Sequence, residues 1–355
     1  MQVLIFNFGS TSSKVAVFED ETEKFSETIR HDPELLASFA LPQDQFEMRK
    51  EAVFEALDKA GYDLSKFDAV CSRAGLLSPI PSGTYKINDK AIEDVMDIEI
   101  GGRQPHGLGI RVADAISKEF GIPAYFCDPV STDEMQDVAR VTGFKGMTRK
   151  SQFHALNQKA VARKAAADLG KKYNEVNLIG VHLGGGTSVA AHVKGQCIDI
   201  SDCSEEDAFA LDRSGGLPVT QVVDLCFEGQ SKADIKMMLR RAGGLSSYLD
   251  TTDFREVCKR VDEGDKEAKL IYDALVYQHV KTIGAFAAIM GFDVDGIFFT
   301  GGMAYDEGFM KAFKSYNIEK IAPVFIYPGE EEMLALAQGA LRVLNGEEEA
   351  KEYNR

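Results

Sequence analysis

The sequence predicts an α/β protein in which mixed sheets are flanked by helices and the whole scaffold is duplicated. Three observations carry this prediction. An apolar strand, a small hydroxyl-rich turn and a second strand occupy residues 3–18, and the same pattern returns over residues 178–191. Elsewhere, helical patterns alternate with short apolar strands. A chain of 355 residues is also too long for one typical core and fits about two domains.

In the first half, the strand–turn–strand pattern reads as a hairpin over residues 1–18. Apolar residues at helical spacing predict a helix over residues 47–60, and Gly121 ends another over residues 111–120. The expected strands between and after these helices are residues 67–71 and 124–127.

In the second half, residues 151–169 are rich in good helix formers, and we expect Ser151 to cap their helix. The further expected helices are residues 217–226, 231–241, 266–290 and 330–344. The expected strands are residues 178–181, 189–191, 296–299 and 324–327.

The composition limits the partners. The chain has 56 Asp and Glu against 40 Lys and Arg, a formal net charge of −16, which argues against nucleic acid or an anionic membrane as the main partner. Its six cysteines are scattered without zinc spacing, and its start lacks a basic region, so we expect reduced thiols in a cytoplasmic protein. The apolar segment 283–292 is about half a membrane span and favours a buried or interface helix.

Three glycine turns, at residues 9–13, 184–188 and 301–302, each follow an apolar strand directly. No G-x-x-x-x-G-K-[ST] or G-x-G-x-x-G signature is present. One such turn is weak evidence for a ligand, because tight connections need glycine in any case. Three in order within a duplicated frame predict phosphate binding, since such turns present backbone N–H groups, and the first adds hydroxyls and the Lys14 amine.

Eight motifs carry a resemblance that covers nearly the whole chain. They are Asn7-x-Gly9-Ser10-x-Ser12-x-Lys14, Arg73 to Leu77, Asp128 to Val130, Phe153 to Lys159, His182 to Gly186, Asp212 to Gly215, Thr300 to Gly302 and Tyr327 to Met333. Their order resembles the actin-like ATPase superfamily, and within it the butyrate kinases of the acetokinase family. The resemblance implies two ribonuclease-H-like domains, one over residues 1–150 completed by a C-terminal helix over 333–355, and one over residues 151–332.

The resemblance also implies the reaction: reversible, in-line transfer of phosphate from ATP to a short-chain carboxylate, butyrate or a similar acid, to give an acyl phosphate. Elementary chemistry agrees with this expectation. A carboxylate is already ionised at neutral pH, so the reaction needs no general base. It needs cations and hydrogen-bond donors that overcome repulsion between two anions and align them.

The catalytic residues implied by the resemblance are Arg73, Arg213, His154 and Asp128. From position alone each arginine would be a surface ion pair; by resemblance they bind the acceptor carboxylate and the transferring phosphoryl group, for which a planar guanidinium is suited. His154 is expected on the phosphoryl oxygens and His182 on the ATP phosphates. Asp128 is expected to be an orienting or metal-shell carboxylate near the arginines.

The resemblance implies ATP and Mg²⁺ as ligands. The nucleotide-binding residues would be Asn7, Gly9, Ser10, Ser12, Lys14, His182, Gly184, Gly185, Gly186, Gly301 and Gly302. Mg²⁺ takes few protein carboxylates and keeps waters. Residues 330–332 also suit a helix N-terminus simply because they are acidic. By resemblance Glu331 is the preferred metal residue, Glu332 the second choice, and Asn7 the partner through water.

Three stretches depart from the family pattern. They are Phe8, where relatives usually have Pro; residues 104–109, where the expected histidine is displaced or absent and the replacement by His106 is left open; and residues 204–209. Because of these departures, the resemblance does not predict which acyl chain the protein prefers. The small residues Ala74 and Gly75 beside Arg73 are expected to leave room for a tail longer than acetate.

Two other functions remain open at this point. A sugar or polyol kinase on the same scaffold would use Asp128 as its base, and a non-catalytic paralogue would bind nucleotide without turnover. As partners we expect a small carboxylic acid or acyl phosphate and a second copy of the chain. The apolar segment 271–290 is a candidate dimer face, although burial inside one subunit fits equally.

Overall fold

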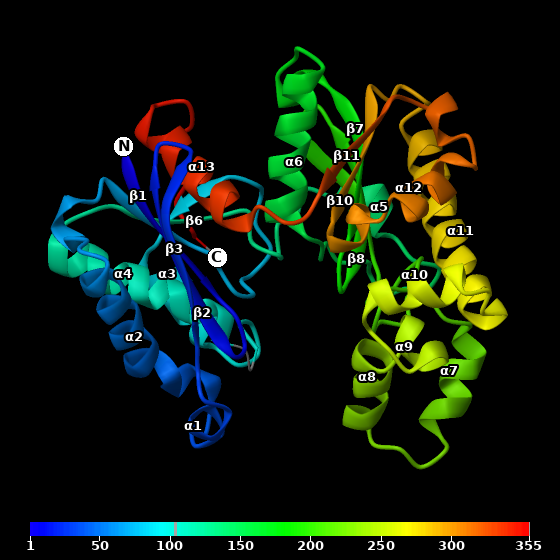
Figure 1. The fold of residues 1–355 in the computed structure, drawn as a ribbon, viewed down its shortest axis with the longest axis horizontal. Helices are drawn as coiled ribbons and strands as arrows, with labels where there is room; N and C mark the ends of the chain where they lie inside the picture. The colour runs from blue at the N-terminus through cyan, green and yellow to red at the C-terminus, as the bar shows by residue number, and fades with distance from the viewer. Residues whose placement is uncertain (103–104, 355) are drawn as a thin grey trace. The chain divides into compact units, whose positions relative to one another are not determined.

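The computed structural model describes residues 1–102 and 105–354, which form two compact units (Figure 1). The first unit comprises Met1–Asp133, Ala155–Asn157 and Glu331–Arg355. The second comprises Glu134–His154 and Gln158–Glu330. The boundary between the two predicted domains, between residues 150 and 151, stays a prediction.

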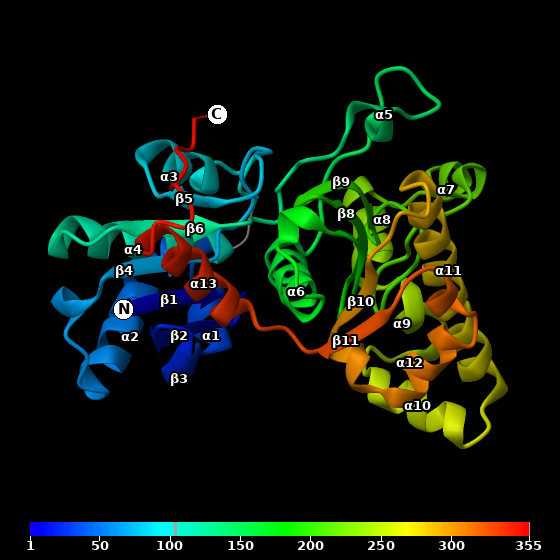
Figure 2. The ribbon, with the colours of Figure 1, turned by 90° about the horizontal axis from the view of Figure 1, so that it is seen from above.

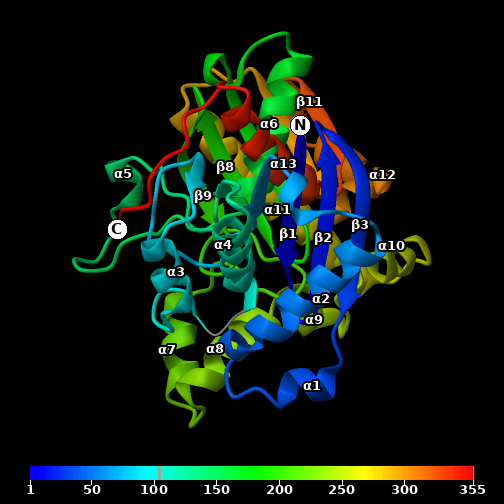
Figure 3. The same cartoon turned by 90° about the vertical axis from the view of Figure 1, so that its left-hand side faces the viewer.

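The sheet of the first unit has six strands in the order β3-β2-β1-β4-β6-β5. Its β1 (Gln2–Phe8), β2 (Ser12–Glu19) and β3 (Thr22–Arg30) form an antiparallel meander, seen side by side in Figure 3. Strands β4 (Ala69–Ser72) and β6 (Ala124–Cys127) continue the sheet parallel to β1, and β5 (Thr84–Lys86) closes the edge antiparallel to β6. The expected N-terminal hairpin is confirmed.

Helices cover both faces of this sheet (Figure 1). On one face, α2 (Phe46–Lys59) and α4 (Leu108–Phe120) share an apolar core with Leu4 and Phe6 of β1. On the other, α13 (Glu332–Leu344) lies so close that a Cβ on Gly339 would be 2.7 Å from the Cys127 sulfur. The smaller helices of this unit are α1 (Pro33–Ala37) and α3 (Asp89–Met96).

The sheet of the second unit has five strands in the order β11-β10-β7-β8-β9. Again three antiparallel strands come first: β7 (Asn177–Leu183), β8 (Thr187–Val193) and β9 (Gln196–Asp202). Strands β10 (Gly296–Gly301) and β11 (Val324–Pro328) then continue parallel to β7. A meander of three strands extended by two parallel strands occurs in both units, so the predicted duplication of an α/β scaffold with mixed sheets is confirmed.

Side chains alternate along the strands of the second sheet, because successive residues point to opposite faces. Leu178 and Phe298 pack against α6 (Ala155–Asp168), and Ile179 and Phe299 pack against the core that includes α11 (Lys266–Ile289). Figure 2 shows these two helices on opposite sides of the sheet. The remaining helices of the unit are α5 (Asp137–Arg140), α7 (Val219–Cys226), α8 (Lys232–Arg241), α9 (Gly244–Leu249), α10 (Phe254–Asp262) and α12 (Glu307–Lys314).

The expected start of α6 is wrong. The helix begins at Ala155, and His154, not Ser151, occupies its N-cap position. The backbone N–H of His154 donates to Ser188 Oγ at 3.4 Å, and its ring Nδ1 lies 2.9 Å from the same oxygen. These bonds hold residue 154 to the neighbouring strand β8 in a non-helical conformation.

Helix α11 buries most of its apolar side chains inside the second unit, including Leu275, Ile283 and Phe286. One face of the segment expected as a dimer face is therefore core, while Tyr277 and Ile289 are exposed. Within the described ranges no helix is both long and apolar enough to cross a membrane. All six cysteines are free thiols.

Candidate active site

The first glycine turn joins β1 to β2. Gly9 N–H donates to Ser12 O at 2.8 Å, and the register of the two strands sets Asn7 opposite Lys14. The turn residue Ser10 is exposed, and no ion pair ties up the Lys14 amine among the residues that the structure describes. The turn therefore offers a small polar edge and one cation.

Arg49 of α2 holds this turn from behind, a role that the sequence interpretation missed. Its side chain is fully buried, and Nη2 and Nη1 donate to the carbonyls of Ser10 and Ser12, each at 3.0 Å. Burial lowers the pKa of the guanidinium to about 10. A signal was present, because Arg49 shares a helical face with the buried residues Val53 and Leu57.

Phe8 is also part of this support. It is 1% exposed, its ring lies 5.9 Å from that of Phe6, and the Arg49 guanidinium lies 5.7 Å from its centre. Successive strand residues point to opposite faces, so the ring faces the core while Asn7 faces away from it. The departure from the family pattern at residue 8 thus fills the core.

Asn7, Arg73 and Glu332 form one polar cluster in the first unit. Asn7 Nδ2 donates to Glu332 Oε2 at 2.6 Å, and Arg73 Nη1 lies 3.3 Å from the same oxygen. Arg73 follows β4, whose parallel pairing with β1 brings the two strand ends together. Glu332 lies in the first turn of α13.

The structure thus brings the second-choice acidic residue to Asn7. Glu331 occupies the N-cap position of α13 and makes no side-chain cap hydrogen bond. In the described ranges no cluster of three His, Cys, Asp or Glu side chains forms a ready metal cage. One carboxylate with an amide oxygen beside it nevertheless fits Mg²⁺, which binds through one or two carboxylates plus substrate phosphates and water.

Asp128 lies at the end of β6 with a left-handed φ of 39° and is 2% exposed. Its Oδ1 accepts hydrogen bonds from Ser82 Oγ at 2.6 Å and from the Gly83 N–H at 2.9 Å. These contacts hold a turn, which weakens the case for Asp128 as the base of a sugar kinase. An orienting role toward the arginines stays a prediction.

The interpretation of Ala74 and Gly75 as space for an acyl tail is wrong. A Cβ on Gly75 would lie 2.9 Å from the backbone nitrogen of Gly107, and Ala74 is 3% exposed in an apolar core. Both residues are small because the chain itself packs there. His106 lies in the short 3₁₀ turn Pro105–Gly107, and Gln104 lies outside the described residues.

In the second unit, the imidazole rings of His154 and His182 stack with centroids 3.8 Å apart and planes inclined by 14°. His182 is near the end of β7, and its Nε2 lies 3.1 Å from Glu330 Oε1, an ion pair when the ring is protonated. Two of the residues expected on phosphate oxygens are therefore adjacent.

The second glycine turn lies beside this stack. A Cβ on Gly184 would be 2.8 Å from His182 Nε2, and one on Gly186 would be 2.4 Å from Arg213 Nη1. Gly185 is exposed, with open space around it. The two glycines thus let both side chains approach the turn, and the structure brings Arg213 and His182 to the same connection.

The third turn follows β10. Gly301 has a φ of 93°, and a Cβ there would lie 2.4 Å from the carbonyl oxygen of Leu183, so only glycine fits. Gly301 and Gly329 exchange two backbone hydrogen bonds of 3.0 Å. Gly302 is exposed just beyond them. The turn is held against the end of β7, which carries His182.

The departure at residues 204–209 has a structural explanation. Glu206 accepts from Arg149 Nη2 at 2.6 Å, and Arg149 Nη1 donates to Asp199 at 2.9 Å. These hydrogen bonds raise the pKa of Arg149. The acidic residue in this stretch therefore anchors the loop that precedes His154.

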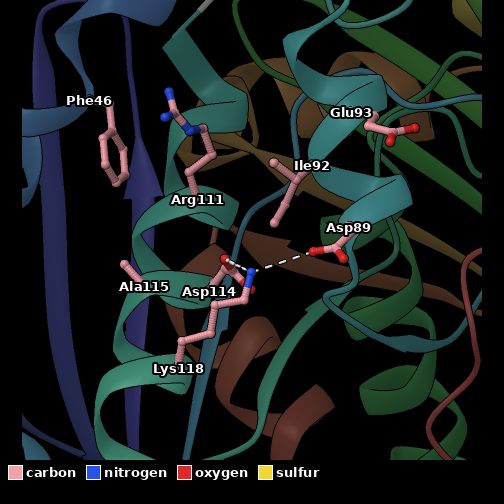
Figure 4. Close-up of a pocket in the computed structure, with 8 residues that line it drawn as sticks. All are labelled: Phe46, Asp89, Ile92, Glu93, Arg111, Asp114, Ala115 and Lys118. Atoms are coloured by element: carbon pink, nitrogen blue, oxygen red, sulfur yellow. Dashed lines mark hydrogen bonds and ion pairs between the residues drawn. The ribbon is translucent and has the colours of Figure 1, made fainter.

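A pocket of about 360 Å³ lies on the first unit between α3 and α4 (Figure 4). Its Lys118 sits between Asp114 at 2.9 Å and Asp89 at 3.4 Å, and Phe46 and Ile92 supply apolar walls. None of the residues that line it belongs to the predicted site. This pocket is therefore not the candidate active site.

Comparisons with known proteins agree with these observations. The model of the acetokinase family matches residues 140–322. The chain is 45% identical to "Butyrate kinase 1" of Clostridium acetobutylicum and to a "Probable butyrate kinase" of Clostridium botulinum, over 99% of this chain and of each relative.

Solved structures agree on the fold. An acetate kinase from Porphyromonas gingivalis matches with a TM-score of 0.80 at 20% identity, covering 97% of this chain and 99% of its own. A propionate kinase from Francisella tularensis matches with a TM-score of 0.77 at 20% identity, covering 95% and 98%. The chain thus has the expected actin-like ATPase fold. Identity to curated relatives over almost the full length places the chain more closely: it belongs to the acetokinase family.

Proposed function

We propose that this protein is an ATP-dependent carboxylate kinase that converts a short-chain acid, butyrate or a close homologue, reversibly into its acyl phosphate. The observation that carries the proposal is the 45% identity to a butyrate kinase over 99% of both chains. The acceptor is ionised at neutral pH, so the protein need only neutralise charge and align the attacking oxygen with the phosphorus.

In the first unit, we assign Arg73 to the carboxylate of the acceptor. Its side chain is 33% exposed and its ion-pair partner, Glu332, lies 3.3 Å from Nη1, so a second anion has access to the remaining N–H donors. A fork of parallel N–H groups suits a carboxylate. The turn at residues 9–12 and Lys14 would contact ATP phosphates.

In the second unit, Arg213, His154 and His182 would contact the phosphoryl group and the ATP phosphates. The arrangement supports this role because cationic and N–H donor groups gather beside a glycine turn, where charge develops during phosphoryl transfer. Gly184, Gly185, Gly186, Gly301 and Gly302 would let the nucleotide approach the backbone.

We further propose that Glu332, with Asn7 beside it, holds the metal through oxygen ligands and water. When bound, Mg²⁺ would neutralise charge on the phosphate oxygens. The donor set supports Mg²⁺ because it offers one carboxylate and one amide, with room left for waters and phosphates. Arg73 Nη1 lies 3.3 Å from the same carboxylate, so the residue proposed to hold the metal contacts the residue proposed to bind the acceptor.

The function is tested by incubating the purified protein with ATP, Mg²⁺ and straight-chain acids of two to five carbons, and trapping acyl phosphate as the hydroxamate. The proposal expects product with at least one acid, with the highest kcat/KM for butyrate or a neighbour. ATP binding without product from any acid would support a non-catalytic paralogue, and turnover of sugars alone would support a sugar kinase.

We also propose a cytoplasmic homo-oligomer. Six free thiols suit a reducing compartment. Large apolar side chains are exposed on and beside α7 and α8, among them Val219, Phe227 and Met237, and a second copy would cover them. Light scattering coupled to size exclusion measures the assembly, and a monomer at micromolar concentration would contradict it.

A further inference from the structure

A series of hydrogen bonds runs through the second unit from the partly buried residue Tyr173 to His154. Tyr173 Oη lies 2.7 Å from His192 Nδ1, and His192 Nε2 lies 3.1 Å from Gln158 Oε1. Gln158 Nε2 donates to Ser188 Oγ at 3.0 Å, and Ser188 Oγ lies 2.9 Å from His154 Nδ1. Gln158, Ser188 and His192 are each at most 2% exposed, so water does not compete for these bonds.

The orientation of Gln158 follows from one contact. Its nitrogen is 3.1 Å from the backbone oxygen of Ser188, and a carbonyl only accepts hydrogen bonds. The NH₂ group must therefore face Ser188, and the amide oxygen must face His192.

The protonation of His192 follows next. Gln158 Oε1 only accepts, so His192 Nε2 carries a hydrogen. Complete burial, with Lys159 and Arg163 nearby, holds the pKa of His192 well below its usual range, so the ring is neutral. Its Nδ1 is then a bare acceptor for the Tyr173 hydroxyl. The Cys197 thiol, 3.4 Å from the same Nδ1, can there act only as a second donor.

The hydrogen bonds of Ser188 determine which ring nitrogen of His154 carries the hydrogen. Its hydroxyl oxygen accepts from Gln158 Nε2 and from the His154 backbone N–H, which occupies both lone pairs. In the described ranges, the remaining partner of the hydroxyl is His154 Nδ1, so its hydrogen points there. An Nδ1 that accepts carries no hydrogen, and the ring hydrogen is then on Nε2.

Two features of the sheet accommodate this series of hydrogen bonds. A Cβ on Gly180 of β7 would lie 2.3 Å from Gln158 Oε1, 2.4 Å from the Phe298 ring and 2.9 Å from His192 Nε2. Gly180 has an ordinary strand conformation, so its backbone alone does not require glycine. The β8–β9 register also shifts between Ala191 and His192, and such irregularities re-aim a side chain.

We propose that Gln158 and Ser188 are positioning residues that hold His154 as a neutral imidazole with its hydrogen on Nε2, so that it donates one hydrogen bond to the phosphoryl group without adding a charge. The stacking distance of 3.8 Å to His182 supports this state, because two facing imidazolium rings would repel each other. The role assigned to the hydrogen bond rests on the proposed function; the tautomer does not.

The tautomer is measured directly on the full-length protein labelled with ¹⁵N-histidine. Two-bond ¹H–¹⁵N correlation spectra distinguish Nε2–H from Nδ1–H rings, and His154→Asn identifies the His154 signals. The proposal expects a pure Nε2–H pattern at pH 7.5 in the absence of substrate. An Nδ1–H ring, or one protonated on both nitrogens, would overturn it.

Variants then test the positioning. Ser188→Ala removes the donor, so the His154 signals should shift toward a mixture of tautomers, and kcat should fall roughly 10- to 100-fold, while KM for ATP changes less than about threefold. Ser188→Thr keeps the hydroxyl and should restore the Nε2–H pattern. Gly180→Ala pushes Gln158 away and should reproduce the effect of Ser188→Ala.

Val189→Ala is the matched control, because Val189 is a buried apolar neighbour of Ser188 on the same strand. It should lower stability and leave the His154 spectrum unchanged. An unchanged spectrum in both Ser188→Ala and Gly180→Ala would overturn the positioning role. An Nε2–H pattern in a protein that phosphorylates no acid would instead refute the proposed function alone.

Discussion

The side-chain amide of Asn7 donates a 2.6 Å hydrogen bond to Glu332, 325 residues later in the chain. The same carboxylate oxygen lies 3.3 Å from Arg73. One acidic group therefore joins the end of the first strand, the start of the last long helix and the arginine proposed for the acceptor. Any change at this oxygen is expected to affect metal and acceptor together.

Glu332→Gln should raise the Mg²⁺ concentration needed for half-maximal rate by about 10- to 100-fold, because it removes the carboxylate and keeps the shape. Glu331→Gln, one residue earlier, is the matched control and should change it less than about twofold. Rates measured from 0.05 to 50 mM Mg²⁺ give the comparison. The opposite ranking would return the metal to Glu331.

Gly186→Ala should lower kcat by about tenfold or more while the protein stays folded, because the new Cβ displaces the flexible end of Arg213. A Cβ on Gly185 points into open space and does not meet Arg213, so Gly185→Ala should leave kcat nearly unchanged, and any loss should appear as a higher KM for ATP. Arg213→Ala should lower kcat by about 10²-fold or more.

The double variant of Gly186→Ala with Arg213→Ala separates the two effects. If the glycine acts through Arg213, the double variant should be no slower than Arg213→Ala alone, because coupled residues are not additive. Additive losses would mean that Gly186 contacts the nucleotide independently.

Arg49→Met should weaken ATP binding, because the carbonyls of Ser10 and Ser12 lose the donors that hold the first turn. We expect KM for ATP to rise by about tenfold and the free energy of unfolding to fall by about 2–3 kcal/mol. Arg49→Lys should recover part of both. Unchanged KM with reduced stability would make Arg49 a core residue only.

Stability should fall in mild acid because of His279 in α11. Its Nδ1 donates to the Leu275 carbonyl at 2.8 Å, its buried Nε2 has no hydrogen-bond partner among the residues that the structure describes, and burial lowers the pKa of the ring to about 4. The unfolded chain has a pKa near 6.5 and takes up the proton first. The contribution is therefore intact above about pH 6.5 and is lost as the pH falls toward 4.

Between pH 7.5 and pH 5 this residue alone should remove about 2 kcal/mol from the free energy of unfolding. Urea titrations of the wild type and of His279→Leu at both pH values measure the difference. Equal losses in the two proteins would show that the acid sensitivity comes from other groups.

The scaffold was predictable because strand–turn–strand patterns and helical periodicity are local signals. The start of α6 was not, because Ser151 suits an N-cap while the bond from His154 to Ser188 is a tertiary contact. Likewise, the small residue Gly75 suggested room for an acyl tail, but the backbone of Gly107 occupies that space.

The sequence could not show whether Glu331 or Glu332 contacts Asn7, for a similar reason. Neighbouring residues at a helix start point about 100° apart, and only the placed helix shows which one faces Asn7. The residues behind His154 were missed for another reason. Gln158 and Ser188 are ordinary residue types, and their role exists only once α6 lies on the sheet.

Helix α13 covers one face of a sheet whose first strand is residues 2–8, yet the ribosome makes this helix only after the entire second unit. Translation proceeds at about 5–20 residues per second, so one apolar face of the first sheet stays uncovered for roughly 10 to 40 s while the second unit is made. The nascent chain at that stage also lacks Glu332. Translation therefore sets a delay in which the unfinished protein is prone to aggregate and has no catalytic capacity, and chaperone binding should concentrate on that interval.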